Sequence, residues 1–136
     1  MLPSSGRLRR RNRITAAHQY TGPPARVRKL VRTRAQDACE WPSCGRVGTD
    51  YHHRLNRKSG GRHGQRREQI NSASWVVLAC RPHHEYVTSP HGAAREDVIA
   101  RGWLLEEHQV AGEVPIRLDG GWVLLDDDGN RSEATA

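Results

Sequence analysis

The stretch Trp75-Val-Val-Leu-Ala-Cys80-Arg-Pro-His83-His84 decides the fold expected for this chain. Its first five residues form a short apolar run with β-branched side chains, which predicts a buried strand. Pro82 favours the first turn of a helix, so a short helix is expected to begin there. Cys80 and His83 lie at the start of this helix, with the spacing of a pair of metal ligands.

A second ligand pair lies upstream, in the turn Cys39-Glu-Trp-Pro-Ser-Cys44. Structural zinc takes four thiolate or imidazole ligands, offered as two close pairs from two parts of a chain. Cys39, Cys44, Cys80 and His83 therefore predict a closed Cys3His zinc site. The alternatives are a disulfide between the first two cysteines with the third as a buried thiol, or three unrelated thiols. An odd number of cysteines argues against a secreted disulfide framework and fits a reducing cytoplasm.

Two adjacent histidines, His52 and His53, lie between the two cysteine-containing segments, in a predicted strand over residues 51–55. Neighbouring residues of a strand point to opposite faces, so different roles are expected for them. His52 and His84 are expected to hold a divalent ion, and water molecules are expected to complete its coordination shell. His53 is expected to act as a general base, because a neutral imidazole with a pKa of about 6.5 suits that task. The alternatives are spare zinc ligands or ordinary surface histidines.

The composition bounds the chain to one compact domain with a thin core. It has 136 residues, of which 35% are hydrophobic and none is Phe, and its mean hydropathy is −0.82. A structural metal is a common remedy for a small core, since the free energy of metal binding becomes folding free energy. No segment approaches the length of a membrane span, and no apolar stretch follows the charged N-terminus as in a secretory signal.

Charge is divided unevenly along the chain, whose net charge is +7. Residues 1–68 hold 17 of the 22 Lys and Arg residues but only four of the 15 acidic residues. A basic half attracts polyanions, and phosphate backbones are the usual target. The simpler alternative is a solvated face that keeps the protein soluble.

The remaining pattern predicts an α+β fold. A helix is expected at about residues 25–37 and another from Ser89-Pro90 to Ala100, with a polar loop over 56–69. A β-hairpin is expected around Gly120-Gly121. The expected organisation is a flexible basic arm (1–22), a metal-finger domain (23–105), and a C-terminal hairpin with a solvated or disordered acidic tail (106–136).

Between about residues 25 and 105 the chain resembles the HNH endonucleases, whose core is a ββα-metal finger, and most closely the phage-type members with an added zinc site. The resemblance is carried by the cysteine pair, by His52-His53-Arg54-Leu55, by Lys58-Ser59-Gly60-Gly61 and by Leu78-Ala-Cys80-x2-His83-His84.

In that family the paired histidines supply a metal ligand and the general base, and the helix-opening histidine supplies another ligand. The resemblance thus implies metal ligands at His52 and His84 and a base at His53. The family's asparagine, which helps to orient the base, corresponds to Asn71, although its usual place is closer to Trp75. A third protein ligand is left open among Thr88, His91 and His63.

The resemblance implies a metal-dependent endonuclease that nicks or cleaves DNA, with structural Zn2+ and a catalytic Mg2+, Mn2+, Ni2+ or Zn2+. It further implies a phage origin, action in the cytoplasm of a bacterial host and an association with terminase subunits. Double-strand cleavage would require a dimer or two successive nicks, because one finger cuts one strand. Alternatives are a catalytically degenerate zinc-bound DNA-binding adaptor and a zinc protein unrelated to DNA. Phosphate contacts are expected from Arg54, Arg57, Lys58, Arg62, Arg66 and Arg67.

Overall fold

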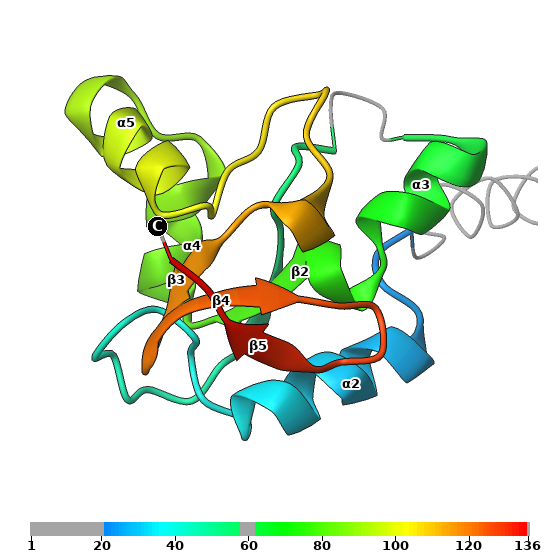
Figure 1. Ribbon diagram of the computed structural model, residues 1–136, viewed down its shortest axis with the longest axis horizontal. Coiled ribbons are helices and arrows are strands. Elements are labelled where there is room, and N and C mark those ends of the chain that lie inside the picture. The colour runs from blue at the N-terminus through cyan, green and yellow to red at the C-terminus, as the bar shows by residue number, and fades with distance from the viewer. Residues whose placement is uncertain (1–20, 58–61, 136) are drawn as a thin grey trace, which may run out of the picture.

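The structure, a computed structural model, describes residues 21–57 and 62–135 of the chain. The arm predicted over residues 1–22 lies outside the described residues except for its last two positions, and Lys58 lies outside them entirely. Within the described residues, no helix is both long and apolar enough to cross a bilayer. The fold is a small α+β arrangement of α2 (Ala25–Ala35), β1 (Asp50–His53), α3 (Gly64–Ile70), β2 (Val76–Ala79), α4 (Arg81–Thr88), α5 (Gly92–Ala100), β3 (Ile116–Leu118), β4 (Gly121–Leu125) and β5 (Arg131–Glu133), with 3-10 turns at Ala73–Trp75 and Ala111–Glu113 (Figure 1).

A two-stranded antiparallel sheet followed directly by a helix forms the centre of the molecule. β1 pairs with β2, so that His52 lies opposite Val77 and His53 opposite Val76. β2 is buried along its whole length, as its apolar run predicts. Cys80 immediately precedes α4 and Pro82 lies in its first turn, which confirms the predicted strand and helix.

Helix α2 runs along one side of the molecule and covers the two-stranded sheet (Figure 1). Its buried residues Val27 and Val31 are four apart, so they lie on one face of the helix. That face packs against Val76 and Leu78 of β2. The helix predicted over residues 25–37 is thus confirmed, with its last turn ending at Ala35.

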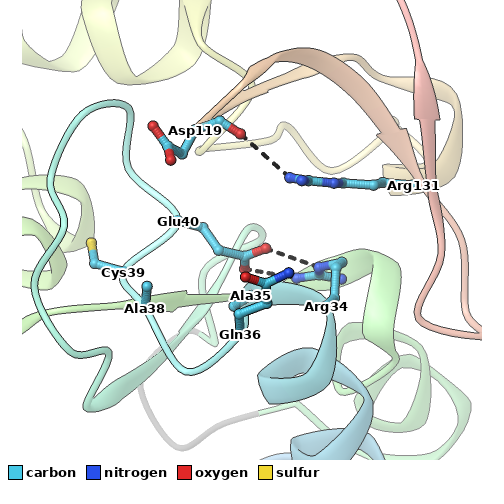
Figure 2. Close-up of a pocket in the computed structure, with 8 residues that line it drawn as sticks. All are labelled: Arg34, Ala35, Gln36, Ala38, Cys39, Glu40, Asp119 and Arg131. Atoms are coloured by element: carbon cyan, nitrogen blue, oxygen red, sulfur yellow. Dashed lines mark hydrogen bonds and ion pairs between the residues drawn. The ribbon is translucent and has the colours of Figure 1, made fainter.

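A buried ion pair ties α2 to the chain that enters the cysteine turn. Arg34 donates from Nε and Nη2 to the two carboxylate oxygens of Glu40, at 3.0 and 2.9 Å, and both side chains are almost fully buried. Figure 2 shows the pair at one end of a cavity of about 190 Å³, with Asp119 and Arg131 at the other end. The Glu40 carboxylate also accepts from the backbone of Leu78, so the pair fixes the chain just after Cys39 against β2.

The C-terminal sheet shares its core with β2 and the helices that follow it. β4 lies between β3 and β5, and all pairings are antiparallel. Alternate residues of β3 and β4 face inward, as the burial pattern along both strands shows. Residues 23–105 and 106–136 therefore do not have separate cores. The largest cluster joins Cys39, Val77, Ala79, Cys80, Val87, Val98, Trp103, Leu104, Ile116, Leu118, Val123 and Leu125.

The C-terminal tail agrees with its prediction in part. The hairpin around Gly120-Gly121 is present, and residues 126–135, expected to be solvated or disordered, are mostly exposed but include strand β5. β5 pairs with β4, and Asp127 accepts hydrogen bonds from the backbone and the hydroxyl of Ser74. The side chains of β5 are exposed, so the strand carries no apolar pattern by which a sequence could reveal it.

The polar stretch 56–69 also differs from its prediction, because Gly64–Ile70 forms helix α3. Only Ile70 of this helix is buried, so a periodic apolar stripe is missing from its sequence. Arg62 and Arg66 both pair with Glu107, at 2.6 and 3.1 Å, which fixes the start of the helix and its first turns to the segment after Leu105.

Arg54 is fully buried, and the prediction that it contacts phosphate is wrong. Its guanidinium donates to the backbone carbonyls of Gly102, Ser74, Ala111 and Val114 at 2.9 to 3.1 Å. Burial, aided by the charge of Arg34, lowers the pKa of Arg54 to about 9. This side chain therefore connects the end of β1 to the two 3-10 turns and to the segment after α5.

Replacing Arg54 with methionine is expected to destabilise the fold by about 3 kcal/mol or more, because buried carbonyls lose a charged donor. Arg57→Met, at an exposed neighbour, is the matched control and is expected to change the free energy of unfolding by about 0.5 kcal/mol or less. Urea denaturation measures both variants. Equal stability of the two variants would contradict the role assigned to Arg54.

Candidate metal centre and histidine pocket

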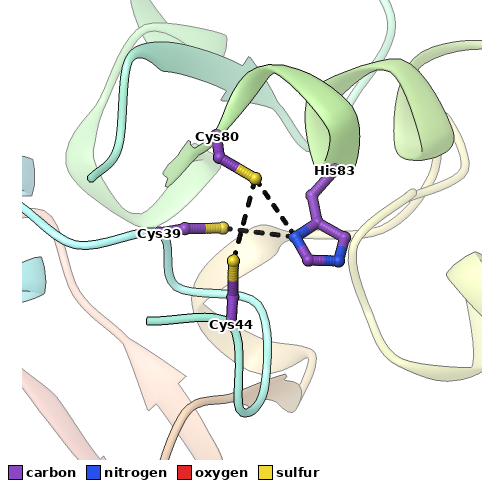
Figure 3. A group of neighbouring side chains, drawn as sticks. All are labelled: Cys39, Cys44, Cys80 and His83. Atoms are coloured by element: carbon purple, nitrogen blue, oxygen red, sulfur yellow. Dashed lines mark hydrogen bonds between the residues drawn. The ribbon is translucent and has the colours of Figure 1, made fainter. Parts of the chain in front are cut away.

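Three cysteines and one histidine converge where the cysteine turn meets the start of α4. Cys39 and Cys44 come from the turn before β1, and Cys80 and His83 from the first turn of α4 (Figure 3). One ligand atom from each of the four lies within 4.8 Å of all the others. All three cysteines are free thiols, so the alternative of a disulfide between the first two is wrong. The four residues are placed to bind a metal ion, as their spacing predicts.

Three of the distances within this cluster are close to the edges of a zinc tetrahedron. Zinc–sulfur bonds of about 2.3 Å and zinc–nitrogen bonds of about 2.0 Å place sulfurs about 3.8 Å apart and sulfur and nitrogen about 3.5 Å apart. The Sγ atoms of Cys44 and Cys80 are 3.8 Å apart. Nδ1 of His83 lies 3.6 Å from Sγ of Cys39 and 3.3 Å from Sγ of Cys80. A soft sulfur-rich donor set with these distances fits a structural zinc ion.

The surroundings of the cluster hold its ligands in place. The ring of Trp41 stacks on His83 with centroids 5.1 Å apart, and its other edges meet Trp103 and Tyr86. Burial raises the pKa of the Cys39 thiol to about 12. A buried thiolate without a nearby cation costs free energy. A bound metal ion offsets this cost, because it stabilises the deprotonated sulfur.

A second candidate site includes His84, the residue that follows His83 on α4. A cavity of about 240 Å³ is lined by side chains of β1, of the chain just after it and of α4. The described lining residues are Tyr51, His52, His53, Asn56, Arg57, His84 and Thr88. Three of the histidines singled out from the sequence thus meet in one pocket.

Two of these imidazoles are each fixed through one ring nitrogen. Nε2 of His52 donates to the carbonyl oxygen of Trp103 at 2.7 Å. Nδ1 of His84 donates to a carboxylate oxygen of Asp50 at 2.8 Å. Each ring then keeps the lone pair of its other nitrogen, which is the pattern found in metal-binding histidines. The two ring centroids are 5.7 Å apart.

The position of Trp103 depends on a glycine. α5 is followed by Gly102, whose φ is +77°, and a Cβ atom there would lie 2.2 Å from the carbonyl oxygen of Pro115. Only glycine therefore allows the chain to turn here and approach the segment before β3. Trp103 is fully buried, its indole donates to the carbonyl of Arg117, and its ring stacks with His52.

His53 is held by a different set of contacts. Its Nε2 donates to Oδ1 of Asn71 at 2.6 Å, which leaves Nδ1 as the unprotonated nitrogen. The amide of Asn71 in turn donates to the carbonyl oxygen of Thr21 at 3.1 Å, which fixes the orientation of the amide. Asn71, rather than a residue near Trp75, is thus the asparagine beside His53, and Trp75 lies in the apolar core.

Burial keeps the two adjacent histidines neutral. Burial lowers the pKa of His52 to about 3. Burial also lowers the pKa of His53, and the nearby positive charge of Arg57 lowers it further. Only a neutral imidazole can bind a metal ion or accept a proton. Both rings are thus in the required form at neutral pH.

The other candidates from the sequence divide clearly. Thr88 lines the pocket, although its hydroxyl donates to the carbonyl of His84, whereas His63 and His91 are exposed residues just before α3 and α5. Of the predicted phosphate contacts, Arg57 lines the pocket. Arg62 and Arg66 are paired with Glu107, and Arg67 donates to the carbonyl of Arg62.

Two contributors to the pocket were missed from the sequence. Asp50 precedes His52 by two residues, so strand alternation could have placed both on the same face of β1. Trp103 contributes through a backbone carbonyl, which every residue carries, so no sequence signal marks it.

No protein-family model, curated protein or solved structure matches the chain.

Proposed function

We propose that this protein is a metal-dependent endonuclease of the HNH type that hydrolyses phosphodiester bonds of DNA. The observation that carries the proposal is the histidine pocket, which is lined by His53, held by Asn71, and by two further imidazoles that each keep one ring nitrogen free of hydrogen bonds. Two antiparallel strands followed by a helix, with the histidines on the first strand and on the helix, agree with a ββα-metal finger.

His52 and His84 would hold the catalytic ion in this proposal. Among the described residues, the Cys3His cluster is the one group of three or more His, Cys, Asp or Glu side chains placed to share an ion. Two imidazoles leave most of a coordination shell to water and substrate, as an open catalytic site requires. When bound, a divalent ion in such a site stabilises the charge that develops on the phosphate and on the leaving oxygen.

His53 would accept the proton of the attacking water. Asn71 holds Nε2 of this ring, so Nδ1 is the nitrogen that can accept a proton. Arg57 lines the same pocket and supplies a positive charge for the phosphate. The structural zinc in the Cys3His cluster would keep α4, and thereby His84, in register with β1.

A zinc-bound DNA-binding adaptor without activity is the alternative. It needs the zinc ligands and the basic surface but no oriented base, so the contact between His53 and Asn71 favours the nuclease. Incubation of supercoiled plasmid with Mg2+, Mn2+, Ni2+ or Zn2+ separates the two. Nicked or linear products in at least one ion are expected; binding without products in all four would favour the adaptor.

The rate of cleavage is expected to fall at acidic pH with a midpoint below 6.5. Burial lowers the pKa of His53 from its ordinary value, so the base stays neutral to a lower pH than a solvated imidazole. The rate should therefore rise with pH through this lowered pKa and be level near neutrality. Single-turnover rates between pH 5 and 8, with zinc content checked at each pH, measure this. A midpoint above 6.5 would contradict the assignment of His53 as the base.

A further inference from the structure

Asp50 contacts one of the two histidines proposed to hold the ion, His84. It lies on the same side of β1 as His52, since the two residues are separated by one position in the strand. That side of the strand contacts α4. The carboxylate of Asp50 is only 10% exposed, and its Oδ2 atom accepts from both His84 and Arg81, at 2.8 and 3.0 Å.

Asp50 also has a side-chain hydrogen bond with Thr49, and its two partners on α4 differ in what they contribute. Arg81 and His84 are three residues apart on α4, so one carboxylate reaches both from the same face. The side chain of Arg81 is 71% exposed, and a pair with so exposed a partner contributes little to the stability of a fold. The contact with His84 is more enclosed, because that side chain is 30% exposed. The enclosed contact of Asp50 with α4 is therefore the one with His84.

We propose that Asp50 is a positioning residue that fixes His84 in the tautomer and ring orientation needed to bind the catalytic ion. By accepting from Nδ1, the carboxylate leaves the lone pair on Nε2, and its negative charge makes this nitrogen a stronger ligand. The carbonyl of Trp103 does the first of these tasks for His52, but without a charge. The inference rests on the proposed function, since it concerns the same ion.

The experiment measures the binding of Mn2+, in the absence of DNA, to protein that carries one zinc per chain. Asp50→Ala is expected to weaken this binding by about 10- to 100-fold, the usual effect of removing a carboxylate behind a metal-binding histidine. Asp50→Asn keeps the volume and an acceptor for Nδ1, so a smaller loss is expected; this variant decides the test if the alanine variant fails to fold. Arg81→Ala is the matched control, which removes the ion pair and leaves the contact with His84, and its affinity should stay within about twofold.

Cleavage assays on the same variants give a second readout. The Mn2+ concentration that gives half-maximal cleavage is expected to rise in Asp50→Ala, with most of the rate recovered at saturating Mn2+. Wild-type affinity in a zinc-loaded, folded Asp50→Ala protein would overturn this inference alone. The absence of any second ion on the wild-type protein would overturn it together with the proposed catalytic site.

Discussion

Cys80→Ser is expected to lose the bound zinc and most of the stability of the fold. Cys80 supplies one of the four converging ligands, at the point where β2 meets α4, so the variant disturbs the ligand set at the centre of the molecule. Structural zinc contributes an apparent binding free energy of about 10 to 16 kcal/mol, which equals or exceeds the whole stability of a typical small domain. We therefore expect the metal-free chain to be largely unfolded at ambient temperature.

Elemental analysis and thermal denaturation measure this effect. The matched control is Glu85→Gln, an exposed substitution on the same helix, which should retain one zinc per chain and unfold at nearly the wild-type temperature. Chelation of zinc from the wild-type protein should reproduce the unfolding of the Cys80 variant. Full zinc content in Cys80→Ser, or an unchanged unfolding temperature, would refute the Cys3His site.

His53→Ala is expected to reduce the cleavage rate by about 100- to 10,000-fold, the usual contribution of a general base. His53 contacts Asn71 rather than the imidazoles proposed to hold the ion, so its removal should leave both metal sites intact. Zinc content, Mn2+ affinity and DNA affinity are all expected to stay close to those of the wild type. This combination separates a lost base from a lost metal ligand.

The control for this variant is His91→Ala, which removes an exposed histidine just before α5 and should leave cleavage unchanged. Single-turnover rates at saturating Mn2+ compare the two variants with the wild type. If His53→Ala cleaves at the wild-type rate, the base lies elsewhere. If it fails to fold, the role assigned to His53 is structural.

The metal cluster was predictable from the sequence because each pair of its ligands is close together in the chain. Two ligands come from one turn and two from the first turn of one helix, so spacing alone groups them. The strand before Cys80 and the helix after it were predictable for the same reason, from an apolar run and from Pro82.

Other features depended on contacts between distant segments. Arg54 reads as one more basic residue beside the histidines, yet its guanidinium meets carbonyls that lie 20 to 60 positions away. β5 has exposed side chains and is held by its pairing with β4, and α3 buries a single residue. Apolar periodicity is absent in both elements, so the sequence offered no signal for them.

The charge pattern of the sequence does not show which arginines are available to bind phosphate. The basic loop before Asn71 suggested a row of phosphate contacts, but Glu107, more than forty positions beyond Arg62, pairs with two of its arginines. A count of charges that are close in sequence misses such partners, because they come from elsewhere in the fold. Arg57 is the described residue of this predicted set that lines the histidine pocket.

The central claim is that this chain cuts DNA with an ion other than the structural zinc. The most direct measurement is the rate at which supercoiled plasmid is nicked as Mn2+ is added to protein that holds one zinc per chain. We predict no nicking before Mn2+ is added, and a rate that then rises to saturation and disappears in His53→Ala. Plasmid that is bound by the zinc-loaded protein but stays supercoiled at every Mn2+ concentration would contradict the claim.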